Sequence, residues 1–231
     1  MMWAFSAHNT EIMTMTTLKQ NIFTEKYGLT PTHSEVLEAF PQLKVGKALD
    51  LGCGNGRNTL FLNQQGFDVT AWDHNPQSLA RLNSIIAEEG LQGIHTEQRD
   101  LNNTRFNGGY DFVLSTVVMM FLQPETIPQL IADMQASTVK YGFNLIVAAM
   151  NTDDTPCPAD FSFAFKSGEL SNYYRNWHIL KYNENLGQLH RTDENGNRIN
   201  CRFATLLAQK AATDYFRCFF RQRLISSGDC D

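Results

Sequence analysis

The sequence predicts an α/β protein with a doubly wound, mostly parallel seven-stranded sheet that ends in an antiparallel C-terminal hairpin. Strand-like apolar segments alternate five times with helix-like segments, as in parallel sheets with crossover helices. Residues 110–118 form a nearly continuous apolar run, which is typical of a strand buried on both faces. Residues 193–197 (Asp-Glu-Asn-Gly-Asn) supply the Asn-Gly pair of a hairpin turn between two further strand-like segments.

The individual elements follow from apolar periodicity and from residues that start or stop helices. Strands are expected at residues 47–50, 68–73, 94–99, 110–118, 143–150, 178–192 and 198–208. Helices are expected at residues 30–40, 57–65, 76–89, 124–134 and 166–174. Thr30 or Thr32 is expected to cap the first helix. Pro76 suits a first helical position, and Gly66 and Gly90 suit helix ends.

We divide the chain into three parts. Residues 1–20 show no periodicity and are interpreted as a flexible leader. Residues 21–210 form one domain, and residues 211–231 form a tail rich in Phe and Arg. This tail could be an added helix, a partner-binding segment or a read-through without function.

Composition indicates a cytoplasmic protein that binds neither nucleic acid nor membranes. The net charge of −5 gives no general surface for polyanions. The five cysteines include no C-x-x-C pair, which argues against a disulfide framework or a structural zinc site, so no metal is expected. No apolar run approaches the ~20 residues that span a bilayer, and the first residues lack a secretory signal.

A glycine-rich turn follows the first expected strand. Gly52, Gly54 and Gly56 give the spacing G-x-G-x-G, which differs from the G-x-G-x-x-G of dinucleotide sites. Asp50 directly precedes the turn and would repel a pyrophosphate, whereas it would attract a cation. S-adenosylmethionine, with its sulfonium and α-amino groups, fits this charge. We expect Asp50 and Arg57 to orient its methionine end, and Gly52 and Gly54 to leave room for it.

Acidic residues end the next two expected strands. Asp73 lies about 20 residues beyond the turn, the spacing of an acid that binds a ribose diol. It could instead cap the next helix, but Asn75 is available for that role. Asp100 and Leu101 follow the third strand and are expected to bind adenine, although Asp100 could also be a capping residue. Thr116 lies near the carboxyl end of the fourth strand, where open α/β sheets bind ligands.

Two further segments are candidates for covering the site. Tyr27 and His33 flank the first expected helix, either over the mouth of the cofactor site or as ordinary surface residues. Residues 151–165 break the alternating pattern and contain Phe161, Phe163 and Phe165. A long aromatic loop of this kind is interpreted as a lid.

Four segments resemble the TehB tellurite-resistance methyltransferases, a branch of the class I S-adenosylmethionine-dependent methyltransferases with a Rossmann-like fold. They are Leu-Asp-Leu-Gly-Cys-Gly-Asn-Gly-Arg-Asn at 49–58, the strand at 110–118, Asn-Leu-Ile-Val-Ala-Ala-Met at 144–150, and Leu-His-Arg-Thr-Asp with Asn-Gly-Asn-Arg at 189–198. The resemblance covers roughly residues 23–210. The glycine motif specifies only the class, whereas the His-Arg hairpin and the Ala-Ala-Met strand end are narrower.

This resemblance implies an enzyme that uses S-adenosylmethionine to methylate tellurite or selenite, and that contributes to detoxification as tellurite resistance. His190, Arg191 and Arg198 are the candidate catalytic residues, since cationic groups can hold an oxyanion. One or two of them could instead pair with Asp193 or Glu194. The leader and the tail depart from the short family form and leave monomer and homodimer open.

Three alternatives remain open from the sequence. One is a methyltransferase for a small organic acceptor such as a thiol or a carboxylate. Another is a nicotinamide-dependent oxidoreductase, which the glycine spacing and Asp50 disfavour. The third is a non-catalytic sensor that binds S-adenosylmethionine and regulates a partner.

Overall fold

The computed structural model describes residues 22–157, 160–192 and 194–212, together with the side chains of all these residues except His190 and Arg191. The leader expected at residues 1–20 lies outside the described residues, as does the tail from residue 213 onward.

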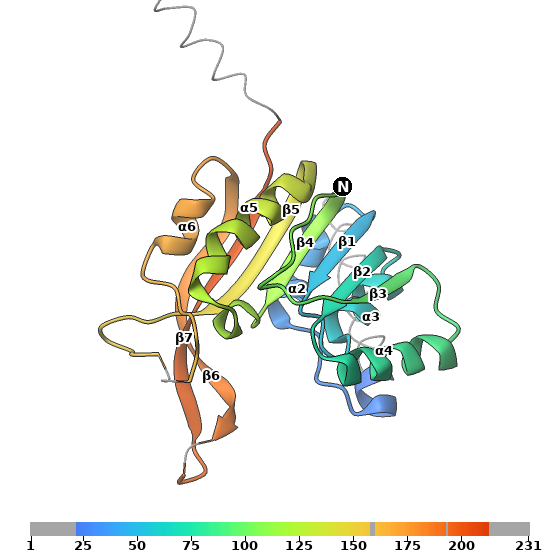
Figure 1. Cartoon of the computed structure of the whole chain (residues 1–231), viewed down its shortest axis with the longest axis horizontal. Helices are drawn as coiled ribbons and strands as arrows, with labels where there is room; N and C mark the ends of the chain where they lie inside the picture. Colours follow the sequence, from blue (N-terminus) through green and yellow to red (C-terminus); the bar gives the residue numbers. More distant parts are fainter. Residues whose placement is uncertain (1–21, 158–159, 193, 213–231) are drawn as a thin grey trace, which may run out of the picture.

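One mixed sheet of seven strands organises the described chain, in the order β3-β2-β1-β4-β5-β7-β6 (Figure 1). Strands β1 to β5 are parallel, and β7 runs antiparallel to both β5 and β6. The strands are β1 (Lys47–Leu51), β2 (Asp68–Asp73), β3 (Ile94–Gln98), β4 (Tyr110–Thr116), β5 (Thr138–Ala149), β6 (His178–Thr192) and β7 (Arg198–Gln209). The predicted fold class is confirmed, including the C-terminal hairpin.

Helices cover both faces of this sheet. They are α2 (Ser34–Ala39), α3 (Arg57–Gln64), α4 (Pro76–Glu88), α5 (Ile127–Ser137) and α6 (Glu169–Tyr173), with 3-10 turns η1 (Phe40–Gln42), η2 (Met119–Phe121) and η3 (Pro124–Thr126). Alternate strand residues point to opposite faces. Ala48, Phe112 and Leu145 pack with α2 and α3, whereas Val113 and Ile146 pack with α5 and α6.

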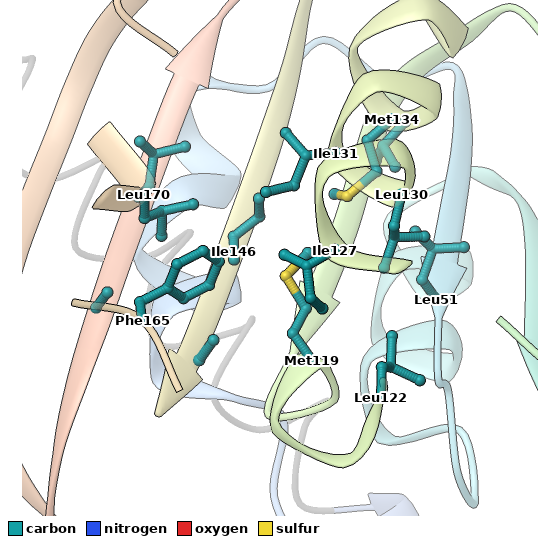
Figure 2. Close-up of a cluster of buried hydrophobic side chains, with 14 of the residues drawn as sticks. Leu51, Met119, Leu122, Ile127, Leu130, Ile131, Met134, Ile146, Phe165 and Leu170 are labelled. Atoms are coloured by element: carbon teal, nitrogen blue, oxygen red, sulfur yellow. The ribbon is translucent and has the colours of Figure 1, made fainter. Parts of the chain in front are cut away.

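The α5 face shows how sequence periodicity builds the core. Ile127, Leu130, Ile131 and Met134 recur at helical spacing, and all four are at most 2% exposed. Figure 2 shows Ile127 and Ile131 near Ile146 of β5, and Leu130 beside Leu51 of β1. Each buried side chain of this size contributes about 1.5–3 kcal/mol to folding.

Helix α2 and strand β5 differ most from their predicted limits. Helix α2 begins at Ser34, with His33 as its N-cap, rather than at residue 30. The preceding residues are held across the start of α3, where the Thr32 hydroxyl donates to the Arg57 carbonyl at 3.2 Å and the His33 N–H donates to Asn58 Oδ1 at 3.1 Å. Strand β5 begins at residue 138, five positions before the predicted 143, and passes through Tyr141 with φ 64°.

Within the described part of the chain, helices are too short or too polar to cross a bilayer.

Candidate active site

The turn between β1 and α3 is built from glycines in the left-handed region. Gly52 and Gly54 have φ values of 72° and 55°. A Cβ atom on Gly52 would lie 2.4 Å from Cγ2 of Val118, so this position must be glycine for the segment after β4 to pack against the turn. A Cβ atom on Gly54 would meet no atom within 4 Å. Gly54 therefore borders open space, which is where a ligand could approach the backbone.

Asp50 lies under this turn and is almost completely buried, with 1% exposure. Its Oδ2 accepts a hydrogen bond of 2.7 Å from the Thr59 hydroxyl of α3. Burial raises the pKa of this carboxyl to about 6, although the nearby Arg57 opposes the shift. A buried carboxylate of this kind is stabilised by a cationic ligand.

Asp73 ties the glycine turn to the end of β2. Its carboxylate accepts hydrogen bonds from the backbone N–H groups of Gly54 and Asn75, both at 2.8 Å. The Asn75 side chain caps α4 by accepting from the Gln77 N–H at 2.9 Å, which is the capping role expected for it. A carboxylate has about four acceptor positions, so Asp73 can still bind ligand hydroxyls.

A cavity of about 290 Å³ opens at this edge of the sheet and is called the nucleoside cavity below. It brings together four of the predicted cofactor residues, Gly52, Asp73, Asp100 and Leu101. The Asp100 carboxylate accepts from the Asn102 N–H at 3.0 Å and from Asn103 Nδ2 at 2.6 Å. The other lining residues are His74, Arg99, Asn102, Val117, Val118, Phe121 and Leu122.

A larger cavity of about 720 Å³ adjoins it and is called the acceptor chamber. Val117 and Phe121 line both cavities, so the two spaces meet at the end of β4. Val117 has φ 61°, which is an outlier for a β-branched residue, and such strain often occurs at functional sites. The remaining walls come from α2, α3, β5, the loop after β5, and the β6–β7 hairpin.

Arg57 of α3 supplies a positive charge to the lining of the acceptor chamber. It is the first residue of α3, where the helix N-terminus also favours anions. Burial lowers the pKa of its guanidinium, and Asp50 partly offsets that effect. Among the described residues, no carboxylate forms an ion pair with it. Arg57 is therefore available to bind the carboxylate of a ligand.

Four predicted cofactor residues line neither cavity. Asp50 and Gly54 belong to the glycine turn described above, and the other two are Thr116 and Tyr27. The Thr116 hydroxyl accepts a hydrogen bond of 2.9 Å from Asn58 Nδ2, which joins β4 to α3. The Tyr27 hydroxyl donates to Glu89 at 2.5 Å, beyond the end of α4. The structure thus gives both residues supporting contacts and does not bring them into either cavity.

The three predicted catalytic residues belong to the hairpin. His190 and Arg191 lie in β6, and their side chains are outside the described part of the structure. Arg198 is the first residue of β7, is exposed, and pairs with Thr192 near the end of the hairpin. Figure 1 shows this end of the hairpin projecting from the domain. Arg198 does not line the acceptor chamber, so its contact with substrate stays a prediction.

Sequence analysis missed several polar residues of the chamber, among them Asn183 and Asn185 of β6. Their alternate spacing on one strand face was the available signal. His33 also lines the chamber, whereas its expected companion Tyr27 does not. In the predicted lid, Phe161 lines the chamber and contacts the Phe121 ring at 5.4 Å, but Phe165 is a fully buried core residue.

The sheet order, the reversed β7 and the acidic glycine turn after β1 define a class I S-adenosylmethionine-dependent methyltransferase. The YcgJ protein from Bacillus subtilis shares this fold at a TM-score of 0.60 with 12% identity, over 78% of this chain and 100% of that one.

The chain belongs to the TehB family. The family model described as "Tellurite resistance protein TehB" matches residues 15–207. A relative from Haemophilus influenzae strain 10810, named "Probable S-adenosyl-L-methionine-dependent methyltransferase TehB", is 52% identical over 83% of this chain and 67% of its own length. The crystal structure of TehB from Haemophilus influenzae superimposes with a TM-score of 0.80 at 51% identity, over 83% of this chain and 67% of that one. The predicted family and cofactor are confirmed.

The residues present fit S-adenosylmethionine. Asp50 supplies a buried negative charge, and Gly54 borders open space. Asp73 and Asp100 offer carboxylates in the nucleoside cavity, where the Leu101 side chain supplies an apolar contact. The negative charge of Asp50, the space beside Gly54 and the carboxylates of the nucleoside cavity are thus suited to binding a cationic sulfonium nucleoside.

Proposed function

We propose that this enzyme methylates tellurium or selenium oxyanions in the cytoplasm and thereby contributes to tellurite resistance. The observation that carries the proposal is the acceptor chamber, which meets the nucleoside cavity at Val117 and Phe121. An acceptor in this chamber would lie beside the turn that holds the methionine end of the cofactor. Membership in the tellurite-resistance family favours an oxyanion as that acceptor.

The cofactor, when bound, supplies an electrophilic sulfonium methyl group. Asp50 and Arg57 orient its methionine end through opposite charges, while Gly52 and Gly54 leave room for the backbone approach. Asp73 accepts hydrogen bonds from the ribose, and Asp100 with Leu101 binds adenine. These contacts fix the direction of the methyl group, and such alignment is the main requirement of an in-line displacement.

The acceptor side needs charge more than it needs a base. Tellurite and selenite already carry a nucleophilic lone pair, so the enzyme has no proton to remove before transfer. His190, Arg191 and Arg198 would hold the anion, with the planar guanidinium groups matching its oxygens.

The test is the triple variant His190→Ala, Arg191→Ala and Arg198→Ala. Release of S-adenosylhomocysteine with tellurite should fall at least ~100-fold, consistent with losing several charge-assisted contacts of about 1.5–3 kcal/mol each. Calorimetric titration should show nearly unchanged affinity for S-adenosylmethionine.

A matched control replaces His95, Arg81 and Arg175 by alanine, which removes the same residue types elsewhere on the surface. This control should retain turnover. Full turnover in the hairpin variant would exclude the assigned substrate contacts.

A methyltransferase for a small organic acceptor, such as a thiol or a carboxylate, is the second candidate. The specific observation is that apolar side chains form much of the chamber wall and enclose more volume than an inorganic oxyanion fills. These side chains are Val117, Phe121, Val147, Phe161, Leu186, Leu189 and Phe203. A screen of tellurite, selenite, thiols and carboxylates, read by S-adenosylhomocysteine release, separates the two candidates.

A further inference from the structure

Two cysteines from separate segments meet behind the acceptor chamber. Cys201 lies in β7 and is completely buried, whereas Cys157 is half-buried in the loop after β5. The loop is folded back by the hydrogen bond from the Cys157 N–H to Asn151 Oδ1 at 3.0 Å. Its base is fixed to β7, because the Met150 N–H donates to the Arg202 carbonyl at 2.8 Å. Both side chains pack into one apolar cluster, and the two thiols interact with each other within it.

This pair lies directly behind the chamber wall. Cys157 and Cys201 belong to one apolar cluster that also contains Leu189, Phe161 and Phe203. These last three residues line the acceptor chamber. A group bound by the two thiols would therefore lie next to the space assigned to the acceptor.

The thiols are suited to condensation rather than to attack as thiolates. Burial raises the pKa of both groups, to about 11 for Cys157, so both remain protonated at neutral pH. A protonated thiol reacts slowly with peroxides. It can, however, give its proton to a departing oxygen while its sulfur binds a soft element.

We propose that Cys157 and Cys201 form a dithiol site that captures tellurium(IV) oxyanions directly behind the wall of the acceptor chamber. In this step two S–H bonds and two Te–O bonds break, and two S–Te bonds form. The two hydroxyl groups of tellurous acid leave as water with the two thiol protons, and tellurium keeps its oxidation state. The choice of tellurium rests on the proposed function, whereas the ability to bridge a soft oxo-species rests on the paired thiols.

The geometry is tested with phenylarsine oxide, which bridges two thiols and releases one water. The full chain carries Cys218→Ser and Cys230→Ser, so that the tail cannot contribute thiols. After washing with a monothiol, intact-mass spectrometry should show one phenylarsenic group per chain. Adding Cys157→Ser or Cys201→Ser should remove it, whereas Cys53→Ser, at a buried cysteine elsewhere, should not. The proposal would be overturned if the protein that carries only Cys218→Ser and Cys230→Ser stayed unmodified. It would also be overturned if the phenylarsenic adduct persisted after Cys157→Ser.

Tellurite is then tested on the same proteins without S-adenosylmethionine. Elemental analysis after gel filtration should find about one tellurium per chain. Cys157→Ser should reduce it at least tenfold, while the melting temperature stays close to that of the protein with only Cys218→Ser and Cys230→Ser. Equal tellurium in both proteins would refute the site. Because this readout needs no cofactor, its failure leaves methyl transfer by the enzyme untouched. Loss of turnover in the hairpin variant, in turn, leaves thiol capture measurable.

Discussion

At the scale of single residues, Asp50 combines a cost to the fold with a gain in binding. Its carboxyl group is 1% exposed and is hydrogen-bonded to Thr59, and burial raises its pKa from 3.8 to about 6. A charged carboxylate at this depth is unfavourable without a partner. A cationic ligand supplies that partner, so ligand binding and charging of Asp50 should be coupled.

The pH dependence of stability tests this coupling in the free enzyme. Between pH 4 and 6 the folded state keeps a proton on Asp50 that the unfolded chain has lost. The stabilisation that protonated Asp50 gives the folded state is therefore complete below the pKa of this group in the unfolded chain. It is lost as pH rises through about 6. The loss is at most about 3 kcal/mol. Urea unfolding from pH 4 to 7 should show this slope in the wild type and not in Asp50→Asn.

The cofactor affinity should show the opposite dependence on pH. Affinity for S-adenosylmethionine should increase as pH rises through about 6, because Asp50 becomes charged. Asp50→Asn should bind weakly at every pH. Parallel affinity curves for the two proteins would rule out Asp50 as the group that senses the cofactor's charge.

At the scale of elements, local signals predicted most boundaries, and long-range contacts caused the exceptions. The glycine turn and the α4 cap depend on residues that are close together in the sequence, so the spacing of those residues was sufficient to predict both features. The start of α2 was predicted too early, because His33 is held by Asn58 of α3, a contact that no local pattern encodes. The position of Tyr27 against Glu89 was missed for the same reason.

The turn itself can be tested with Gly54→Ala. The substitution forces a side chain into φ 55° and should lower the free energy of unfolding by about 1–2 kcal/mol. The added methyl would point into open space in the free protein, where the cofactor is expected to lie. Affinity for S-adenosylmethionine should therefore fall about tenfold or more, which is ~1.4 kcal/mol.

Gly90→Ala is a matched control for this substitution. Gly90 has φ 61°, and a Cβ atom on it would likewise meet no atom within 4 Å, but it lies after α4 rather than at the site. It should show a similar loss of stability in thermal unfolding and no change in calorimetric affinity. Equal affinities for the two variants would contradict the assignment of the space beside Gly54.

At the scale of the whole molecule, the nucleoside cavity was far more predictable than the acceptor chamber. Asp50, Asp73 and Asp100 each lie at or just beyond the carboxyl end of a parallel strand, and these ends meet at one edge of the sheet. The chamber instead joins residues from opposite ends of the domain, such as His33 and Asn185. The shape of the chamber depends on how α2 packs against the hairpin, and sequence periodicity does not specify that packing.

Lys181 links these two ends of the domain. Its ammonium group in β6 lies 2.6 Å from Glu35 and 2.7 Å from Glu38, both in α2. Lys181→Met should destabilise the enzyme by about 1 kcal/mol, since the pair is only partly exposed. It should also raise the KM for the acceptor several-fold, because α2 and β6 form facing walls of the chamber. The Kd for S-adenosylmethionine should change little, because the nucleoside cavity has no wall from either element.

The matched control is Lys26→Met, since Lys26 pairs with Glu88 at 2.9 Å and Glu89 at 2.7 Å at the end of α4. It removes the same charge and the same kind of double ion pair, but from a contact that does not join two walls of the chamber. Steady-state kinetics of both variants at low and high salt should show a higher KM only for Lys181→Met, and high salt should raise the wild-type KM toward it. An equal rise in both variants would mean that global charge, rather than the link between α2 and β6, sets access to the acceptor chamber.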